Sequence, residues 1–162
     1  MTNKIKACLT GFFLAMLTGA VAAQELPRSG SIKWHTGWRL AGETLDVAEG
    51  HVQGHGSVVG TSFNDSGSGP LHLGPAECVY TFYSNGEKVT DKGYCAFGDA
   101  DGDRIFTDWT GNGKDGTSGV NVIVGGTGKY EGITGKGPWF NSGGTGKNGG
   151  WKTFQRLDYR LP

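Results

Sequence analysis

The sequence predicts an all-β fold, a closed antiparallel barrel of about eight strands, with a β-sandwich as the alternative. Three observations support this prediction. Glycine accounts for 31 of the 162 residues without a G-x-y period, which excludes collagen and disfavours long helices. Five Trp, five Tyr and eight Phe supply ample apolar surface, so disorder is a poor explanation of the composition. Apolar and polar residues alternate with a period of two in several short stretches separated by turn signals.

The first strands follow from this alternation. From Ser31 to Leu40, apolar or aromatic residues alternate with polar ones, so the strand has one apolar face. His35 falls on the other face and is expected to point to solvent. A second strand region covers residues 45–63 and breaks near Glu49-Gly50. Residues 64–70 form a loop by composition.

The clearest hairpin covers residues 77–97. Residues 77–83 and 88–97 are strand-like, and Asn85-Gly86 between them is a strong turn signal. A two-residue turn would place Gly93 opposite Cys78, with Cys95 two residues further along on the same face. A longer turn or a bulge would bring the two sulfurs together, so we expect a disulfide that staples the hairpin. Closing this loop would stabilise the fold by roughly 3 kcal/mol.

Four further strands complete the count. They are expected at 103–109, after the Asp99–Gly102 turn; around Val120, Val122 and Val124; at 130–139; and at 151–159, after a Gly-rich loop over 141–150. Closing the sheet would remove its edge strands. The interior of such a barrel is either filled by side chains or able to hold one small ligand.

The first 23 residues have the order of an export signal. Two lysines form a positive n-region, an apolar stretch covers residues 9–17, and small residues lead up to Ala23. The apolar stretch is shorter than the ~20 residues that a transmembrane helix needs. We expect cleavage after Ala23, with Ala22 as the alternative, which leaves residues 24–162 as a single domain in the periplasm or outside the cell.

Cleavage changes the cysteine count and the charge. Of the three cysteines, Cys8 is removed, and the pairing of Cys78 with Cys95 is favoured in an oxidising compartment. Two of the 15 basic residues lie in the signal, so the mature chain has a small negative net charge. It has no basic stripe, which argues against nucleic acid or an anionic membrane as a partner. The mature chain has no second apolar segment that would predict insertion into a membrane.

One segment resembles a known family signature. Residues 122–135, Val-Ile-Val-Gly-Gly-Thr-Gly-Lys-Tyr-Glu-Gly-Ile-Thr-Gly, are similar to the strand-turn-strand signature of the allene oxide cyclase-like and dirigent-like barrels. Gly93-Tyr94-Cys95 followed by Asp99–Asp103 resembles exported bacterial members. The resemblance implies an eight-stranded barrel with a central cavity. Plant relatives cyclise a fatty-acid epoxide or orient phenoxy radicals, and their catalytic residues have no counterparts that this sequence identifies.

Candidate catalytic groups are few. His51 and His55 share one face of a strand with Gln53, but no third ligand lies nearby, so rim or solvent-facing histidines are favoured over a metal site. Glu49 and Glu77 lie in strand-like stretches, where an inward carboxylate would have a raised pKa. An exposed carboxylate is the simpler interpretation of each. No metal or cofactor is predicted.

The acidic turn and the aromatic residues allow two further interpretations. Asp99, Asp101 and Asp103 fail the EF-hand pattern, which favours a plain acidic turn over a weak calcium site. Aromatic residues on the expected strands would form the core or, in a hollow barrel, line the cavity. These are Trp34, Trp38, Tyr80, Phe82, Trp109 and Trp139.

The function predicted from the sequence is binding of a small apolar or aromatic molecule in a central cavity, with or without cyclase or isomerase activity. The alternative is a non-enzymatic secreted carrier or protein-interaction module. The fold by itself does not decide between these functions.

Overall fold

The protein is a closed barrel of eight antiparallel strands in sequential order, with β1 hydrogen-bonded to both β2 and β8. The computed structural model describes residues 26–111, 116–142 and 150–162. The strands are β1 (Ser29–Ala48), β2 (His51–Asn64), β3 (Gly74–Ser84), β4 (Val89–Gly98), β5 (Arg104–Gly111), β6 (Ser118–Gly126), β7 (Thr134–Ser142) and β8 (Gly150–Arg160). A 3-10 turn, η1 (Gly128–Tyr130), precedes β7. The barrel prediction is confirmed, and the sandwich alternative is excluded.

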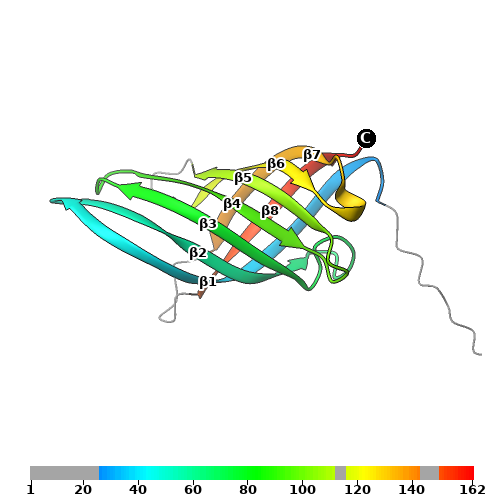
Figure 1. Cartoon of the computed structure of the whole chain (residues 1–162), viewed down its shortest axis with the longest axis horizontal. Helices are drawn as coiled ribbons and strands as arrows, with labels where there is room; N and C mark the ends of the chain where they lie inside the picture. The colour runs from blue at the N-terminus through cyan, green and yellow to red at the C-terminus, as the bar shows by residue number, and fades with distance from the viewer. Residues whose placement is uncertain (1–25, 112–115, 143–149) are drawn as a thin grey trace, which may run out of the picture.

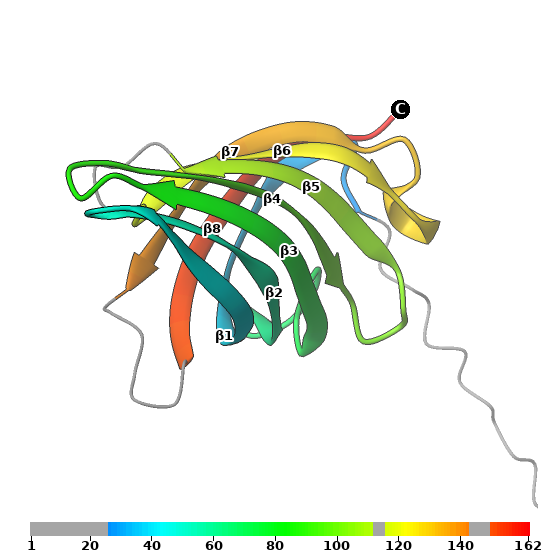
Figure 2. The same ribbon diagram turned by 60° about the vertical axis from the view of Figure 1, so that its left-hand side comes forward.

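The strands wrap around the interior of the barrel (Figures 1 and 2). The β1–β2 and β3–β4 turns lie at one end, while η1 and the C-terminus lie at the other. The hairpin of β1 and β2 projects beyond the rest of the barrel in Figure 1. This projection explains why the second half of β1 is exposed on both faces. We call the end near the β1–β2 turn the mouth and the end near η1 the base.

The base is filled by a compact apolar core. Residues from the inward faces of the strands and from the loops at the base pack there, and the largest fully buried side chains are Trp34, Tyr130, Phe97, Leu71, Ile105 and Leu157. Trp34 packs edge-on against Phe97, with ring centroids 5.2 Å apart. Burial of rings of this size is the main source of stability in a small domain.

A polar network closes the base and explains the family-like signature. Asp99 accepts hydrogen bonds from the Tyr130 hydroxyl (2.6 Å) and from the backbone N–H of Leu71. Lys129 Nζ lies 2.7 Å from Asp99 and 2.6 Å from Asp101. Burial works against the charge on Lys129, but its hydrogen bonds to the two carboxylates outweigh burial and raise its pKa. The Gly-Thr-Gly-Lys-Tyr segment and the acidic turn therefore hold each other in place.

The close approach of these two segments requires glycine at position 128. Its φ is +55°, and a Cβ there would lie 1.8 Å from Asp103 Oδ1. The backbone N–H of Lys129 donates to the same carboxylate at 3.1 Å. The acidic turn is thus an element of the base.

The expected elements differ from the observed ones in two places. The stretches expected at 31–40 and from residue 45 to the break near Glu49-Gly50 form one continuous strand, β1, which ends at Ala48. The strand expected at 130–139 begins only at Thr134, because the chain first makes the 3-10 turn that docks Tyr130 into the core. The Gly-rich loop expected at 141–150 falls largely on residues 143–149, which lie outside the described residues, as does the expected signal at 1–23. Among the described residues, no helix is long and apolar enough to cross a membrane.

Candidate functional site: an aromatic cavity at the mouth

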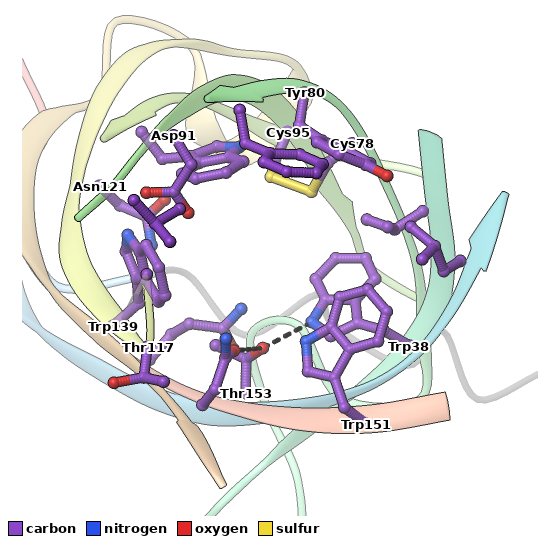
Figure 3. Close-up of a pocket in the computed structure, with 18 of the residues that line it drawn as sticks. Trp38, Cys78, Tyr80, Asp91, Cys95, Thr117, Asn121, Trp139, Trp151 and Thr153 are labelled. Atoms are coloured by element: carbon purple, nitrogen blue, oxygen red, sulfur yellow. Dashed lines mark hydrogen bonds between the residues drawn. A yellow bond between two sulfur atoms is a disulfide. The ribbon is translucent and has the colours of Figure 1, made fainter. Parts of the chain in front are cut away.

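A cavity of about 360 Å³ occupies the mouth end of the barrel (Figure 3). Every strand contributes to its wall, and the lining is dominated by rings: Trp38, Tyr80, Phe82, Phe97, Trp109, Trp139 and Trp151. Leu40, Val58 and Val89 add aliphatic surface. Its volume and largely apolar lining fall within the range of small-molecule sites in proteins.

Glycines on neighbouring strands make room for the rings. Gly93 is the register partner of Trp109, and Gly119 is the partner of Trp139. A Cβ would lie 2.8 Å from Trp109 Nε1 at the first position and 2.7 Å from Trp139 Cε2 at the second. Each ring therefore lies over bare backbone instead of crossing the centre of the barrel. The same pairing joins Trp38 to Gly60, Tyr80 to Gly56 and Phe82 to Gly54. It keeps the mouth hollow.

One side of the wall carries polar groups that are already paired. Trp38 Nε1 donates to Thr153 Oγ1 at 2.9 Å, and that hydroxyl donates to Asn141 Oδ1 at 2.9 Å. Figure 3 shows Trp38, Trp151 and Thr153 together on this side, with Asp91 and Tyr80 across the opening. The paired groups give the cavity a polar edge that can orient a ligand.

Asp91 is the carboxylate of the cavity. It is half-buried on the inward face of β4, and its Oδ1 has no hydrogen-bond partner. Burial raises the pKa of Asp91 from 3.8 to about 6, and a hydrogen bond from its own backbone N–H opposes only part of this rise. A carboxyl group with such a pKa can give up or accept a proton near neutral pH.

The disulfide forms part of the wall beside Asp91. Cys78 and Cys95 are direct register partners on β3 and β4, and the bond lies against the cavity. The four-residue connection between Ser84 and Val89 sets this register, so the expected longer turn is confirmed, as is the disulfide. The staple holds together the two strands that carry Tyr80 and Asp91.

Five of the six aromatic residues expected at a cavity line this one. The exception is Trp34, which is fully buried in the core at the base and is absent from the cavity wall. Trp34 lies four residues before Trp38 on β1 and is therefore closer to the base, whereas Trp38 reaches the cavity. Sequence alternation assigned both to the same face correctly, but it gave no depth along the barrel axis.

The four weak catalytic candidates lie elsewhere. Glu49 is an exposed residue of the β1–β2 turn, so its assignment to a strand is wrong. Glu77 lies on the outer face, where Arg104 Nη1 donates to it at 2.8 Å. His55 is exposed on the outer face of β2, and His51 on the same face is bonded to the Tyr83 hydroxyl. None of these side chains enters the cavity.

No cluster of three metal-ligating side chains occurs among the described residues. The three aspartates of the acidic turn are engaged by Lys129 and Tyr130 at the base, as described above. A further hollow of about 700 Å³ lies beside this network, lined mainly by polar loop residues. It lacks the aromatic wall of the mouth cavity.

Asp91 is the residue that sequence reasoning missed, although a signal was present. Positions 91, 93, 95 and 97 alternate onto one face, and the expected disulfide requires Cys95 to face Cys78. Counting back from Cys95 in steps of two reaches Asp91. The same count places Glu77, next to Cys78, on the opposite face.

Comparison with known proteins supports the fold. No family model and no curated protein sequence matches the chain. Among solved structures, a pterocarpan synthase dirigent protein matches with a TM-score of 0.55 at 15% sequence identity, covering 85% of this chain and 94% of that one. The chain shares the barrel fold of a dirigent protein. At this identity the likeness extends to the fold and leaves the function to the geometry of the site.

Proposed function

We propose that the protein binds one small apolar or aromatic molecule in the mouth cavity. The observation that carries this proposal is a hollow of about 360 Å³ with a ring-lined wall, in a barrel whose base holds a packed apolar core. Apolar surface buried in such a site contributes roughly 25 cal/mol per Å² to binding. The structural neighbour's description as a pterocarpan synthase is compatible with a small-molecule site in this type of barrel.

Blocking the mouth tests the proposal. Leu40→Trp places an indole on the inward face of β1 at the cavity wall, while Ala41→Trp adds the same ring on the outward face. Naphthalene and indole serve as probes in calorimetric titration of the folded mature chain. We expect both probes to bind the wild type and Ala41→Trp, and Leu40→Trp to lose at least about tenfold in affinity. Equal binding by all three proteins would place the probes outside the cavity and refute the proposal.

Asp91 favours a second candidate function, proton transfer on the bound molecule. A cyclase or isomerase of this kind needs a base or acid beside an apolar substrate, and Asp91 meets this need with a pKa of about 6. The test is exchange of the α-protons of a bound aryl ketone in D₂O, followed by NMR. We expect the wild type to accelerate exchange and Asp91→Asn to abolish the acceleration. Binding without any acceleration would leave a carrier as the function.

We also propose that the chain is exported with residues 1–23 removed. The disulfide supports this, since such bonds persist in oxidising compartments. Mass spectrometry of the protein recovered from a secreting bacterial host should give a mature chain that begins at Gln24. A full-length chain with free thiols in the cytosol would contradict the proposal.

A further inference from the structure

The described wall of the mouth cavity contains one acidic side chain and no basic one. Among the described residues that line it, the ionisable side chains are Asp91 and Tyr80. Burial raises the pKa of Tyr80 above its ordinary value of 10.0, so near pH 8 the phenol is neutral while the carboxyl group of Asp91 is ionised. No lysine, arginine or histidine belongs to this described lining. Among the described residues of the wall, none carries a positive charge that would balance an ionised Asp91.

The residues next to the Asp91 carboxylate include glycines, which offer no side chain as a partner. Its carboxylate lies over Gly111 of β5, where a Cβ would be 1.6 Å from Oδ1, and near Gly116, where a Cβ would be 3.5 Å from Oδ2. Register pairs the next inward residue, Gly93, with Trp109. The elements that pack against Asp91 thus place no described cation beside it.

The rest of the wall also favours positive charge. Four tryptophans, Trp38, Trp109, Trp139 and Trp151, line the cavity, and Figure 3 shows three of them, Trp38, Trp139 and Trp151, around the opening with Asp91. Trp109 and Trp139 meet edge to face, with centroids 5.5 Å apart. The faces of indole rings carry negative potential and attract organic cations, and tryptophan is the most effective side chain in this role. A carboxylate among several indoles is the arrangement that recognises an alkylated or protonated amine.

We infer that the cavity selects organic cations, in which a substituted ammonium group near Asp91 is attached to a small aromatic or apolar body. This inference rests on the proposed small-molecule site and names its ligand class. The ammonium would offset the charge of Asp91 and contact the indole faces, while the body of the ligand fills the apolar remainder. A neutral molecule of the same shape would gain only the burial of its apolar surface.

A pair of isosteric probes separates charge from shape. Phenyltrimethylammonium and tert-butylbenzene differ only in the exchange of N⁺ for carbon, and benzenesulfonate supplies an anion of similar size. Calorimetric or NMR titration of the mature chain near pH 8 should give the cation at least about tenfold higher affinity than the neutral isostere. The anion should bind more weakly than either.

Two aspartate variants locate the source of the selectivity. Asp91→Asn removes the charge inside the cavity and should bring the cation-to-neutral affinity ratio close to one. Asp108→Asn removes the same charge from the outer face of the neighbouring strand β5, beyond the cavity wall, and should keep the wild-type ratio. Equal ratios in the two variants would show that selectivity arises from net charge and would overturn the inference.

Lowering the pH provides an independent measurement on the unmodified protein. The cation's affinity should fall as the pH drops through about 6, where Asp91 takes up a proton, while the affinity of tert-butylbenzene stays level. Tyr80, the other ionisable group of the described wall, stays neutral over this range. If the neutral isostere binds as well as the cation at every pH, the cation inference fails and the small-molecule site stands. If none of the probes binds, the proposed function fails as well.

Discussion

Asp91 and Asp99 mark the two ends of β4 on its inward side and have opposite surroundings. Both follow the inward alternation of β4, one near its start at the mouth and the other just past its end at the base. Asp99 is 5% exposed and is bonded to Tyr130, Lys129 and the N–H of Leu71. Asp91 is half-buried, and its Oδ1 has no partner. The fold satisfies Asp99 with several partners, whereas among the described residues Asp91 Oδ1 has none.

The difference separates a carboxylate with structural partners from the one to which we assign ligand binding. Burying a charge costs free energy unless partners compensate it, and the base shows that this fold can supply such partners. An unpaired carboxylate in a hollow therefore lowers stability and persists for another reason. The mouth also leaves the indole N–H groups of Trp109 and Trp139 unpaired. The base has unpaired groups too, Trp34 Nε1 and His72 Nδ1, so the contrast between the two ends rests on the two carboxylates.

The largest effect is expected at the base. Asp99→Ala removes the acceptor of the Tyr130 hydroxyl and leaves Lys129 beside a cavity in the core. Breaking a buried pair in this way should lower the free energy of unfolding by about 3–5 kcal/mol. Urea unfolding of the purified mature chain measures this loss. Tyr130→Phe, which deletes only the hydroxyl, should cost about 1.5–3 kcal/mol, because it removes one hydrogen bond to a charged group. A loss below about 1 kcal/mol for Asp99→Ala would refute the structural role.

The disulfide between the two aspartates should give the next largest effect. Cys95 lies midway along β4, and its bond to Cys78 closes a loop of 17 residues. Chain entropy predicts a stabilisation of roughly 3 kcal/mol. The Cys78→Ser/Cys95→Ser double variant should therefore melt at a lower temperature than the oxidised wild type. A reducing agent should lower the melting temperature of the wild type and leave that of the double variant unchanged. Identical melting curves for the wild type with and without reductant would contradict the staple.

Sequence alternation predicted the barrel well because side chains must alternate between its two faces. Ile32, Trp34 and Trp38 were assigned to one face of the first strand, and all three are buried. The connection between β3 and β4 and the disulfide followed from the turn signal and the two cysteines. The late start of β7 was missed, because the docking of Tyr130 against Asp99 overrides the local strand pattern.

The site was harder to predict because it depends on depth and register. Trp34 and Trp38 share a face, but only register with the other strands shows that one fills the base and the other lines the mouth. Whether a barrel is hollow depends on where its rings lie, and that depends on cross-strand glycines such as Gly93 and Gly119. Asp91 was within reach of the alternation rule, as counting back from Cys95 shows. That its Oδ1 has no partner can be seen only from the positions of the neighbouring side chains.

Removing the charge of Asp91 should raise the free energy of unfolding, whereas removing that of Asp99 should lower it. The pKa of Asp91 is about 6 in the folded state against 3.8 as the reference, so the native state holds its proton to higher pH than the unfolded state. Its contribution to stability is therefore lost as the pH rises from about 4 to about 6 and stays unfavourable above that range. With allowance for solvent screening of a half-buried group, Asp91→Asn should gain about 1–2 kcal/mol near pH 8.

The pH dependence distinguishes this gain from a general packing effect. Near pH 4, where Asp91 is protonated in the folded state, the variant and the wild type should unfold at nearly the same urea concentration. A gain that persists undiminished at that pH would show that the amide improves packing and that Asp91 bears no electrostatic cost. A loss of stability near pH 8 would reveal a partner for Asp91 and would remove its contrast with Asp99.

The smallest effect is expected for a carboxylate that is paired but exposed. Glu77 lies on the outer face of β3 and is bonded to Arg104, and the two side chains are 60% and 43% exposed. Water already solvates both charges, so Glu77→Gln should change the free energy of unfolding by no more than about 0–1 kcal/mol. Urea unfolding in low and high salt measures this change, and the small difference should shrink further as salt increases.

Having a partner is therefore not what separates Asp99 from Asp91 in energy, since Glu77 has one too. The separation comes from burial, which makes a partner valuable at the base and its absence costly at the mouth. A change above about 2 kcal/mol for Glu77→Gln would break that reasoning, because pairing alone would then account for the contrast.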